Sequence, residues 1–147
     1  MAGFSIPSTT CSEIDGANTA GCLISSSGID YTMSGDITPA SGDSGIERFF
    51  TASDLTVTQT GNITTTGSGA DAVMVYSAPD NALIINGNVA TDGEGAYGMY
   101  LLSSELKLTL NGNILTKKDN AIGFSAMLNN GAYNLNGNIT TEGDDAY

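Results

Sequence analysis

The residues best suited to chemistry in this sequence are acidic side chains that recur after a G-N-x-x-T string. Asp92 and Glu94 follow one copy, Asp119 follows the next, and Asp144 and Asp145 follow the last. Paired carboxylates can hydrolyse polysaccharides, and stacked carboxylate oxygens can bind calcium. The alternative is that they are solvated turn residues that oppose aggregation of exposed strand edges. We expect this solvated role, and assign no catalytic, cofactor-binding or metal residues.

Other catalytic arrangements lack the residues that they need. The chain has no histidine and only two cysteines, which excludes a Ser-His-Asp triad, a Cys-His pair and the usual zinc sites. No phosphate-binding G-x-x-x-x-G-K-[ST] string is present. We therefore expect a protein that is not an enzyme and that needs no cofactor. A polysaccharide-active enzyme is the least favoured function.

The two cysteines, Cys11 and Cys22, are separated by ten residues near the N-terminus. One interpretation is a pair of buried thiols in a reduced protein. The other, which we favour, is a short loop closed by a disulfide, because the composition resembles that of a secreted protein.

The charge is strongly unbalanced, with 16 acidic residues against four basic ones and a net charge of −12. Such a surface repels phosphate backbones and anionic lipid, so we expect no nucleic-acid partner. No apolar stretch approaches the length of a membrane-spanning helix, so we expect no membrane insertion of this segment. The first ten residues lack the basic and apolar regions of a signal peptide, and we expect any such signal to lie outside this sequence.

An internal repeat decides the fold. The string G-N-I-T-T and its variants recur every 25 or 26 residues, with a weaker copy at 35–38: 61–65, 87–91, 112–116 and 137–141. Each repeat adds an apolar middle segment and an alternating L-x-L end, so it contains three short strands. A unit this small buries its apolar face only by stacking on its neighbours.

The sequence therefore predicts an all-β, right-handed, single-stranded parallel β-helix, or β-solenoid. An N-terminal cap with a degenerate first coil occupies residues 1–34. The coils that follow are expected at 35–60, 61–86, 87–111 and 112–136, with a partial coil at 137–147.

Stacking places equivalent residues in columns along the solenoid. The isoleucine and valine of the repeated string predict an aliphatic column, and the glycine before them predicts a corner with close backbone approach. The repeated asparagines predict a ladder in which each side chain bonds to the next: Asn62, Asn88, Asn113 and Asn138.

Two further features leave alternatives open. The chain stops eleven residues into a coil, and we expect a fragment of a longer solenoid; otherwise the last residues form an assembly edge that accepts another chain: Gly143, Asp144, Asp145, Ala146 and Tyr147. Tyr97 and Tyr147 follow the repeated alanine. We expect them in the core, with an exposed aromatic stripe as the alternative.

The unit G-N-I-T-T-x-G-x-x-A-x-G-M-Y, clearest at 87–100 and begun again at 137–147, resembles the passenger-domain repeats of Gram-negative autotransporters. The single close pair of cysteines is similar to that pattern too. The resemblance implies export through an outer-membrane barrel and display at the cell surface, where many such passengers are adhesins.

We therefore expect a secreted or surface-displayed adhesin or structural stalk. Its partners would be copies of itself or other cell-surface proteins and glycans, bound by many weak contacts repeated per coil. The alternative is a subunit of an extracellular filament that assembles head to tail.

Overall fold

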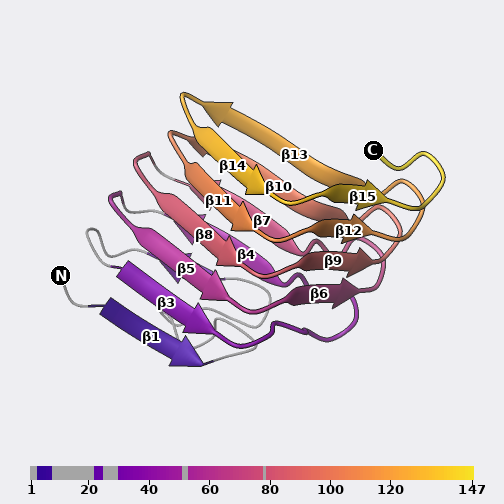
Figure 1. The fold of residues 1–147 in the computed structure, drawn as a ribbon, viewed down its shortest axis with the longest axis horizontal. Helices are drawn as coiled ribbons and strands as arrows, with labels where there is room; N and C mark the ends of the chain where they lie inside the picture. The colour runs from indigo at the N-terminus through magenta and orange to yellow at the C-terminus, as the bar shows by residue number, and fades with distance from the viewer. Residues whose placement is uncertain (1–2, 8–21, 25–29, 51–52, 78) are drawn as a thin grey trace.

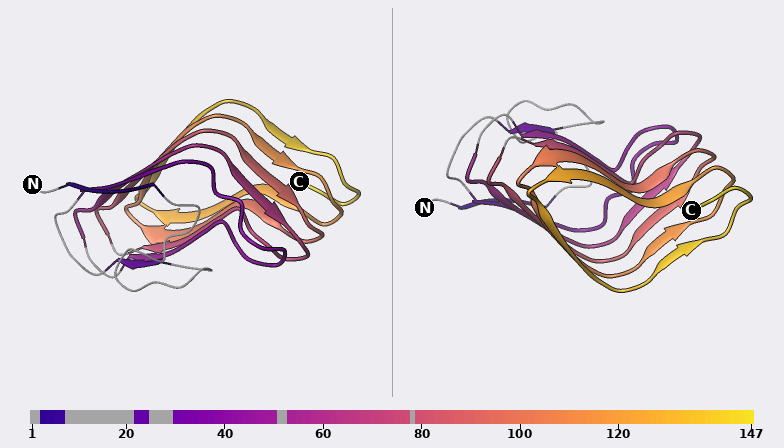
Figure 2. Two further views of the ribbon diagram at one scale, coloured as in Figure 1. Left: turned by 90° about the horizontal axis from the view of Figure 1, so that it is seen from below. Right: turned by 90° about the horizontal axis from the view of Figure 1, so that it is seen from above.

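The computed structural model is all-β and describes residues 3–7, 22–24, 30–50, 53–77 and 79–147. Every pairing between strands in these ranges is parallel, and the strands belong to three sheets. The chain forms a β-solenoid with about three complete turns, each built from three strands (Figure 1). The predicted fold class is confirmed. In Figure 2 successive coils follow the same path, one above the other.

Each coil passes through the three sheets in a fixed order. The six-stranded sheet contains β1 (Gly3–Pro7), β3 (Asp30–Ser34), β5 (Thr56–Thr60), β8 (Ala82–Asn86), β11 (Lys107–Asn111) and β14 (Ala132–Asn136). The four-stranded sheet contains β6 (Ile63–Thr66), β9 (Val89–Asp92), β12 (Ile114–Thr116) and β15 (Ile139–Thr141). The five-stranded sheet contains β2 (Cys22–Ile24), β4 (Ile46–Phe50), β7 (Val73–Ser77), β10 (Tyr97–Ser104) and β13 (Ile122–Asn129).

The core is the line of inward side chains that all three sheets share. Ile63 pairs with Val89, and Val89 with Ile114, in the predicted aliphatic column, and all three side chains are buried. Burying one such side chain contributes roughly 1.5–3 kcal/mol. Because neighbouring strands lie only about 4.8 Å apart, equivalent aliphatic side chains touch from coil to coil. Stability therefore comes from the stack and not from a single coil.

Two connections shape the coil before and after the four-stranded sheet. The first, which we call the glycine corner, holds Gly61, Gly87, Gly112 and Gly137. A Cβ at Gly112 would overlap the carbonyl oxygen of Gly87, and the same overlap recurs at the three other positions. The second, which we call the charged turn, joins the four-stranded to the five-stranded sheet at 67–72, 93–96 and 117–121, and residues 142–147 follow β15 at the equivalent place.

The third connection returns the chain from the five-stranded to the six-stranded sheet. There one residue per coil has φ between 56° and 60°, in the left-handed region: Asp54, Asp80, Glu105 and Asn130. Asp and Asn adopt this conformation more readily than other non-glycine residues. Mixed residue types thus make the same bend in each coil.

Candidate interaction surface

The outer surface of the five-stranded sheet is built from side chains that point away from the core. In β7, Val73 and Val75 are fully buried, whereas the alternate residues Met74 and Tyr76 are only half-buried. Strand pairing extends these two outward positions across β10 and β13. We call the resulting surface the Met–Tyr face: Met74, Tyr76, Tyr100, Leu102, Ser125 and Met127.

The Met–Tyr face is apolar and partly aromatic. Met127 is 63% exposed, and the other members are half-buried. The rings of Tyr97 and Tyr100 meet at its border, with centroids 5.0 Å apart and planes tilted by 47°. Tyr147, in the same column as Tyr97, is 78% exposed. We expected Tyr147 in the core, and the structure places it on the surface instead.

Charge is absent from the strands that carry this face. The sequences of β7, β10 and β13 contain no Asp, Glu, Lys or Arg, although the chain has a net charge of −12. The adjacent strand β4 contains Glu47 and Arg48. One outward column of the six-stranded sheet, by contrast, is polar in three of its four members: Thr58, Ile84, Thr109 and Asn134.

Asp71 lies beside the Met–Tyr face, where its Oδ1 accepts a hydrogen bond of 2.7 Å from the backbone N–H of Tyr97. Burial raises the pKa of Asp71 above its usual value, and the Tyr97 N–H opposes part of that rise. Asp71 therefore holds its proton to a higher pH than a free aspartate does.

The predicted asparagine residues lie in one column at the glycine corner, but their bonds differ from the expected ones. The backbone N–H of Asn88, Asn113 and Asn138 each donates to the Oδ1 of the preceding asparagine at 2.9 Å. Asn62 N–H donates in the same way to Asp36 Oδ1 at 2.8 Å. These contacts are side chain to backbone and not side chain to side chain.

A true amide ladder stands two residues earlier, where sequence reasoning did not place one. Asn111 Nδ2 donates to Asn86 Oδ1 at 2.7 Å, and Asn136 Nδ2 donates to Asn111 Oδ1 at 2.8 Å. The signal was present in the sequence, because an asparagine directly precedes the glycine in three coils.

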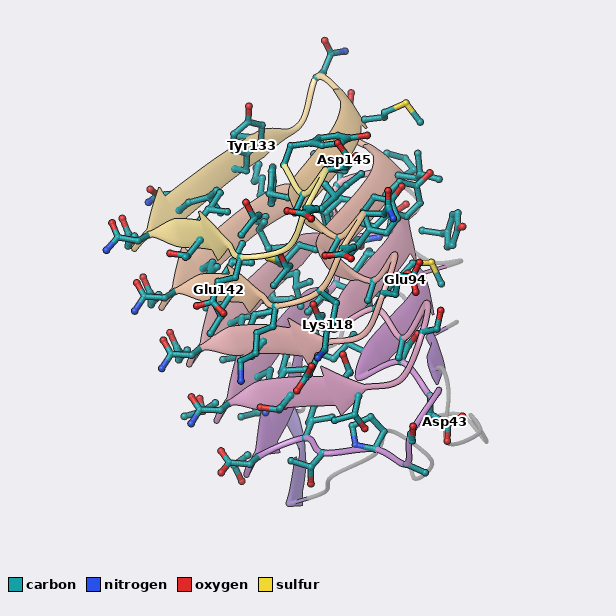
Figure 3. All side chains as sticks on the ribbon, turned by 90° about the vertical axis from the view of Figure 1, so that its right-hand side faces the viewer. Asp43, Glu94, Lys118, Tyr133, Glu142 and Asp145 are labelled. Carbon is teal, nitrogen blue, oxygen red and sulfur yellow. The ribbon has the colours of Figure 1, made fainter. Side chains whose placement is uncertain are left out.

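Two of the acidic side chains that follow the G-N-x-x-T strings take part in structural contacts: Asp92, the last residue of β9, and Asp119, in the charged turn. Asp92 forms an ion pair with Lys118 of the next coil at 3.5 Å, and both side chains are largely exposed. Asp119 Oδ1 accepts the backbone N–H of Asp144 at 2.9 Å. Figure 3 looks onto this turn, with Glu94, Lys118 and Glu142 labelled in successive coils. Within the described residues, no cluster of three or more His, Cys, Asp or Glu residues could hold a metal ion.

The last coil exposes columns that are buried elsewhere. Tyr133 and Ile139 are 58% and 46% exposed, whereas their equivalents Leu108 and Ile114 are 2% and 1% exposed. Figure 3 shows Tyr133 and Asp145 at this end of the stack. In the segment named as the alternative assembly edge, Tyr147 N–H donates to Ala121 O, and Tyr147 O accepts from Gly123 N–H.

Only one of the two cysteines lies within the described residues. Cys22 begins β2, and Cys11 lies outside the described residues, so the disulfide remains a prediction.

Comparison with known proteins gives no assignment: no protein-family model, curated protein or solved structure matches the chain. In the described part of the chain, no helix is long and apolar enough to cross a membrane.

Proposed function

We propose that this chain is a non-enzymatic β-solenoid that acts as an adhesive or structural stalk, using the Met–Tyr face for extended contact with a partner. The observation that carries the proposal is the outward row of Met74, Tyr76, Tyr100 and Leu102 on strands without charge. Apolar residues that gather on an exposed surface mark interaction sites more often than isolated ones do. Met and aromatic residues are enriched at such sites.

The repeat supports contact along a face in preference to a pocket. Each coil presents the same outward positions about 4.8 Å further along the axis. Many weak contacts of this kind add up when several copies are displayed together.

The proposed location is the bacterial cell surface or the extracellular space, as an autotransporter passenger or a protein of similar build. The repeat unit at 87–100 and the low content of charged residues support this location. Its partners would be other cell-surface proteins, glycans or further copies of the chain.

The test uses beads that carry the chain through an N-terminal tag, offered to cultured epithelial cells and to immobilised neutral polysaccharides. We expect wild-type beads to bind at least one of these probes and Tyr100→Asp beads to lose that binding. Thr109→Asp, at an outward half-buried position on the six-stranded sheet, is the matched control and should retain it. Equal binding by wild-type and Tyr100→Asp beads, or no binding by either, would overturn the proposal.

A second candidate function is head-to-tail assembly through the last coil. The stacking supports it, because equivalent strands of successive coils pair in parallel and in register, and a coil of a second copy could add in the same way. Rods in negative-stain images that disappear on Ile139→Asp would support it, and rods that persist in this variant would contradict it.

A further inference from the structure

We propose that the Met–Tyr face is a self-association surface, on which the same face of a second copy packs to form a symmetric pair of solenoids. This inference rests on the proposed function and names the partner of that surface. It differs from head-to-tail assembly, which would use the last coil and leave the Met–Tyr face free.

The chemistry of the face selects an uncharged and apolar partner. The strands β7, β10 and β13 offer no cation to a phosphate or an acidic glycan and no carboxylate to a basic protein. The nearest charge in strand register is Glu47 of β4, which pairs with Met74 at the edge of the face. Met, Leu and Tyr side chains bury well against each other, and Tyr and Met are typical of the centres of protein interfaces. The same face of a second copy supplies these residues.

The charge distribution favours face-to-face contact over other contacts between copies. Each copy has a net charge of −12, so two copies repel each other wherever their acidic turns meet. Packing the Met–Tyr faces together leaves the charged turn, which holds Glu94 and directly precedes β7, β10 and β13, at the rim of the contact. Because the long-range repulsion is screened by salt, the pair should become more stable as the salt concentration rises. A cationic partner would show the opposite dependence.

The geometry is that of two sheets packed face to face. Such sheets lie about 10 Å apart with strands nearly aligned, as in a β-sandwich. A two-fold axis makes the contact closed, so it yields pairs and not fibres. Tyr100 and Leu102 lie on β10, between β7 and β13, and thus near the centre of the contact.

The area of the Met–Tyr face determines how tightly two copies are expected to bind each other. Three strands at about 4.8 Å spacing and roughly 20 Å in length cover about 300 Å². A stable interface buries about 800 Å² per partner. We therefore expect a weak pair, with a Kd of roughly 10–1,000 µM, which becomes effective when many copies are displayed side by side.

The experiment is sedimentation equilibrium of the full chain from about 5 to 500 µM, at low and at high salt. We expect a monomer–dimer equilibrium that shifts toward the dimer at high salt. Tyr100→Asp should weaken the dimer at least about tenfold. Thr109→Asp should leave it unchanged, and far-UV circular dichroism confirms that both variants fold.

A charge-pair experiment tests whether association that is lost in one variant can be restored by a complementary one. Tyr100→Asp and Tyr100→Lys should each be monomeric alone, whereas an equimolar mixture should form a mixed pair. A wild-type chain that stays monomeric throughout would overturn the proposal. It would also be overturned if association survived Tyr100→Asp, or if it depended on Ile139.

The bead assay separates failure of this inference from failure of the proposed function. If the wild-type chain is monomeric but Tyr100→Asp still abolishes bead binding to cells or polysaccharides, the face has a different partner and only self-association is wrong. If Tyr100→Asp changes neither association nor binding, both proposals are wrong.

Discussion

The glycine corner lies before the four-stranded sheet and the tip of the charged turn, at Gly95, lies after it, yet these two places constrain the sequence very differently. At the corner each glycine lies against the carbonyl of the preceding coil, and all four coils keep Gly. In the charged turn, Gly67, Gly93 and Gly143 also lie against the backbone of the preceding coil. At the tip of the turn, by contrast, Gly95 has open space where a Cβ would be, and the equivalent position of the next coil holds Asn120. Contact between backbones therefore favours glycine, although Lys118 takes the place of Gly93 in one coil, whereas exposure to solvent permits variation.

The largest expected effect comes from filling the glycine corner. In Gly112→Ala, the new Cβ overlaps the Gly87 carbonyl, so the backbone of two coils must separate. We expect the free energy of unfolding to fall by about 3 kcal/mol. Urea unfolding followed by circular dichroism measures this. A change below about 1 kcal/mol would show that the corner can relax, and would remove its difference from the charged turn.

A smaller effect is expected from the asparagine contacts of the same corner. Asn88→Ala removes the acceptor of the Asn113 N–H, which should cost about 1 kcal/mol. All of these contacts are exposed, but the bonds that Asn111→Ala breaks join two amide side chains, and ordering both side chains offsets more of the gain, so this variant should cost less. Equal losses in urea unfolding would contradict this ranking.

A pH-dependent effect is expected at Asp71, in the charged turn. Burial raises its pKa in the folded protein, and an unfolded Asp titrates near about 3.9. The contribution of Asp71 to stability is thus complete below the unfolded pKa and is lost as the pH rises through the folded pKa.

Asp71→Asn keeps an oxygen to accept the Tyr97 N–H but does not titrate. From pH 3 toward neutrality, wild type should therefore lose stability relative to Asp71→Asn. Thermal melts of both proteins across this range test the prediction, and a difference that does not vary with pH would contradict it.

The smallest effect is expected at the open position of the charged turn. Gly95 has φ of +67°, a conformation that Asn120 adopts at +56° in the next coil. Gly95→Asn should therefore change the free energy of unfolding by no more than about 0.5 kcal/mol. A loss as large as that of Gly112→Ala would mean that both turns are equally constrained.

The difference between the two turns also explains how far the sequence predicts the structure. The solenoid, its three strands per coil and its aliphatic column follow from Gly61, Gly87 and the residues after them, because stacking imposes the same requirement in every coil. The left-handed bend at Asp54, Asp80 and Glu105 escaped prediction, because several residue types satisfy it.

The Met–Tyr face escaped prediction for another reason. In the apolar segments 73–76 and 99–102, both inward and outward positions are apolar, so alternation gives no signal of which side faces solvent. Only the pairing of β7 with β10 and of β10 with β13 shows that Met74, Tyr100 and Ser125 share an outward column.

The parallel register described above has a mechanical consequence. Each strand is hydrogen-bonded to its equivalents one coil before and one coil after, as in the series β8, β11 and β14. A force along the axis therefore loads one ring of hydrogen bonds at a time. When a coil detaches, roughly 25 residues extend, which releases on the order of 80 Å of chain. A stalk built in this way would lengthen in steps under flow, and the coils beneath the detached one would keep their structure.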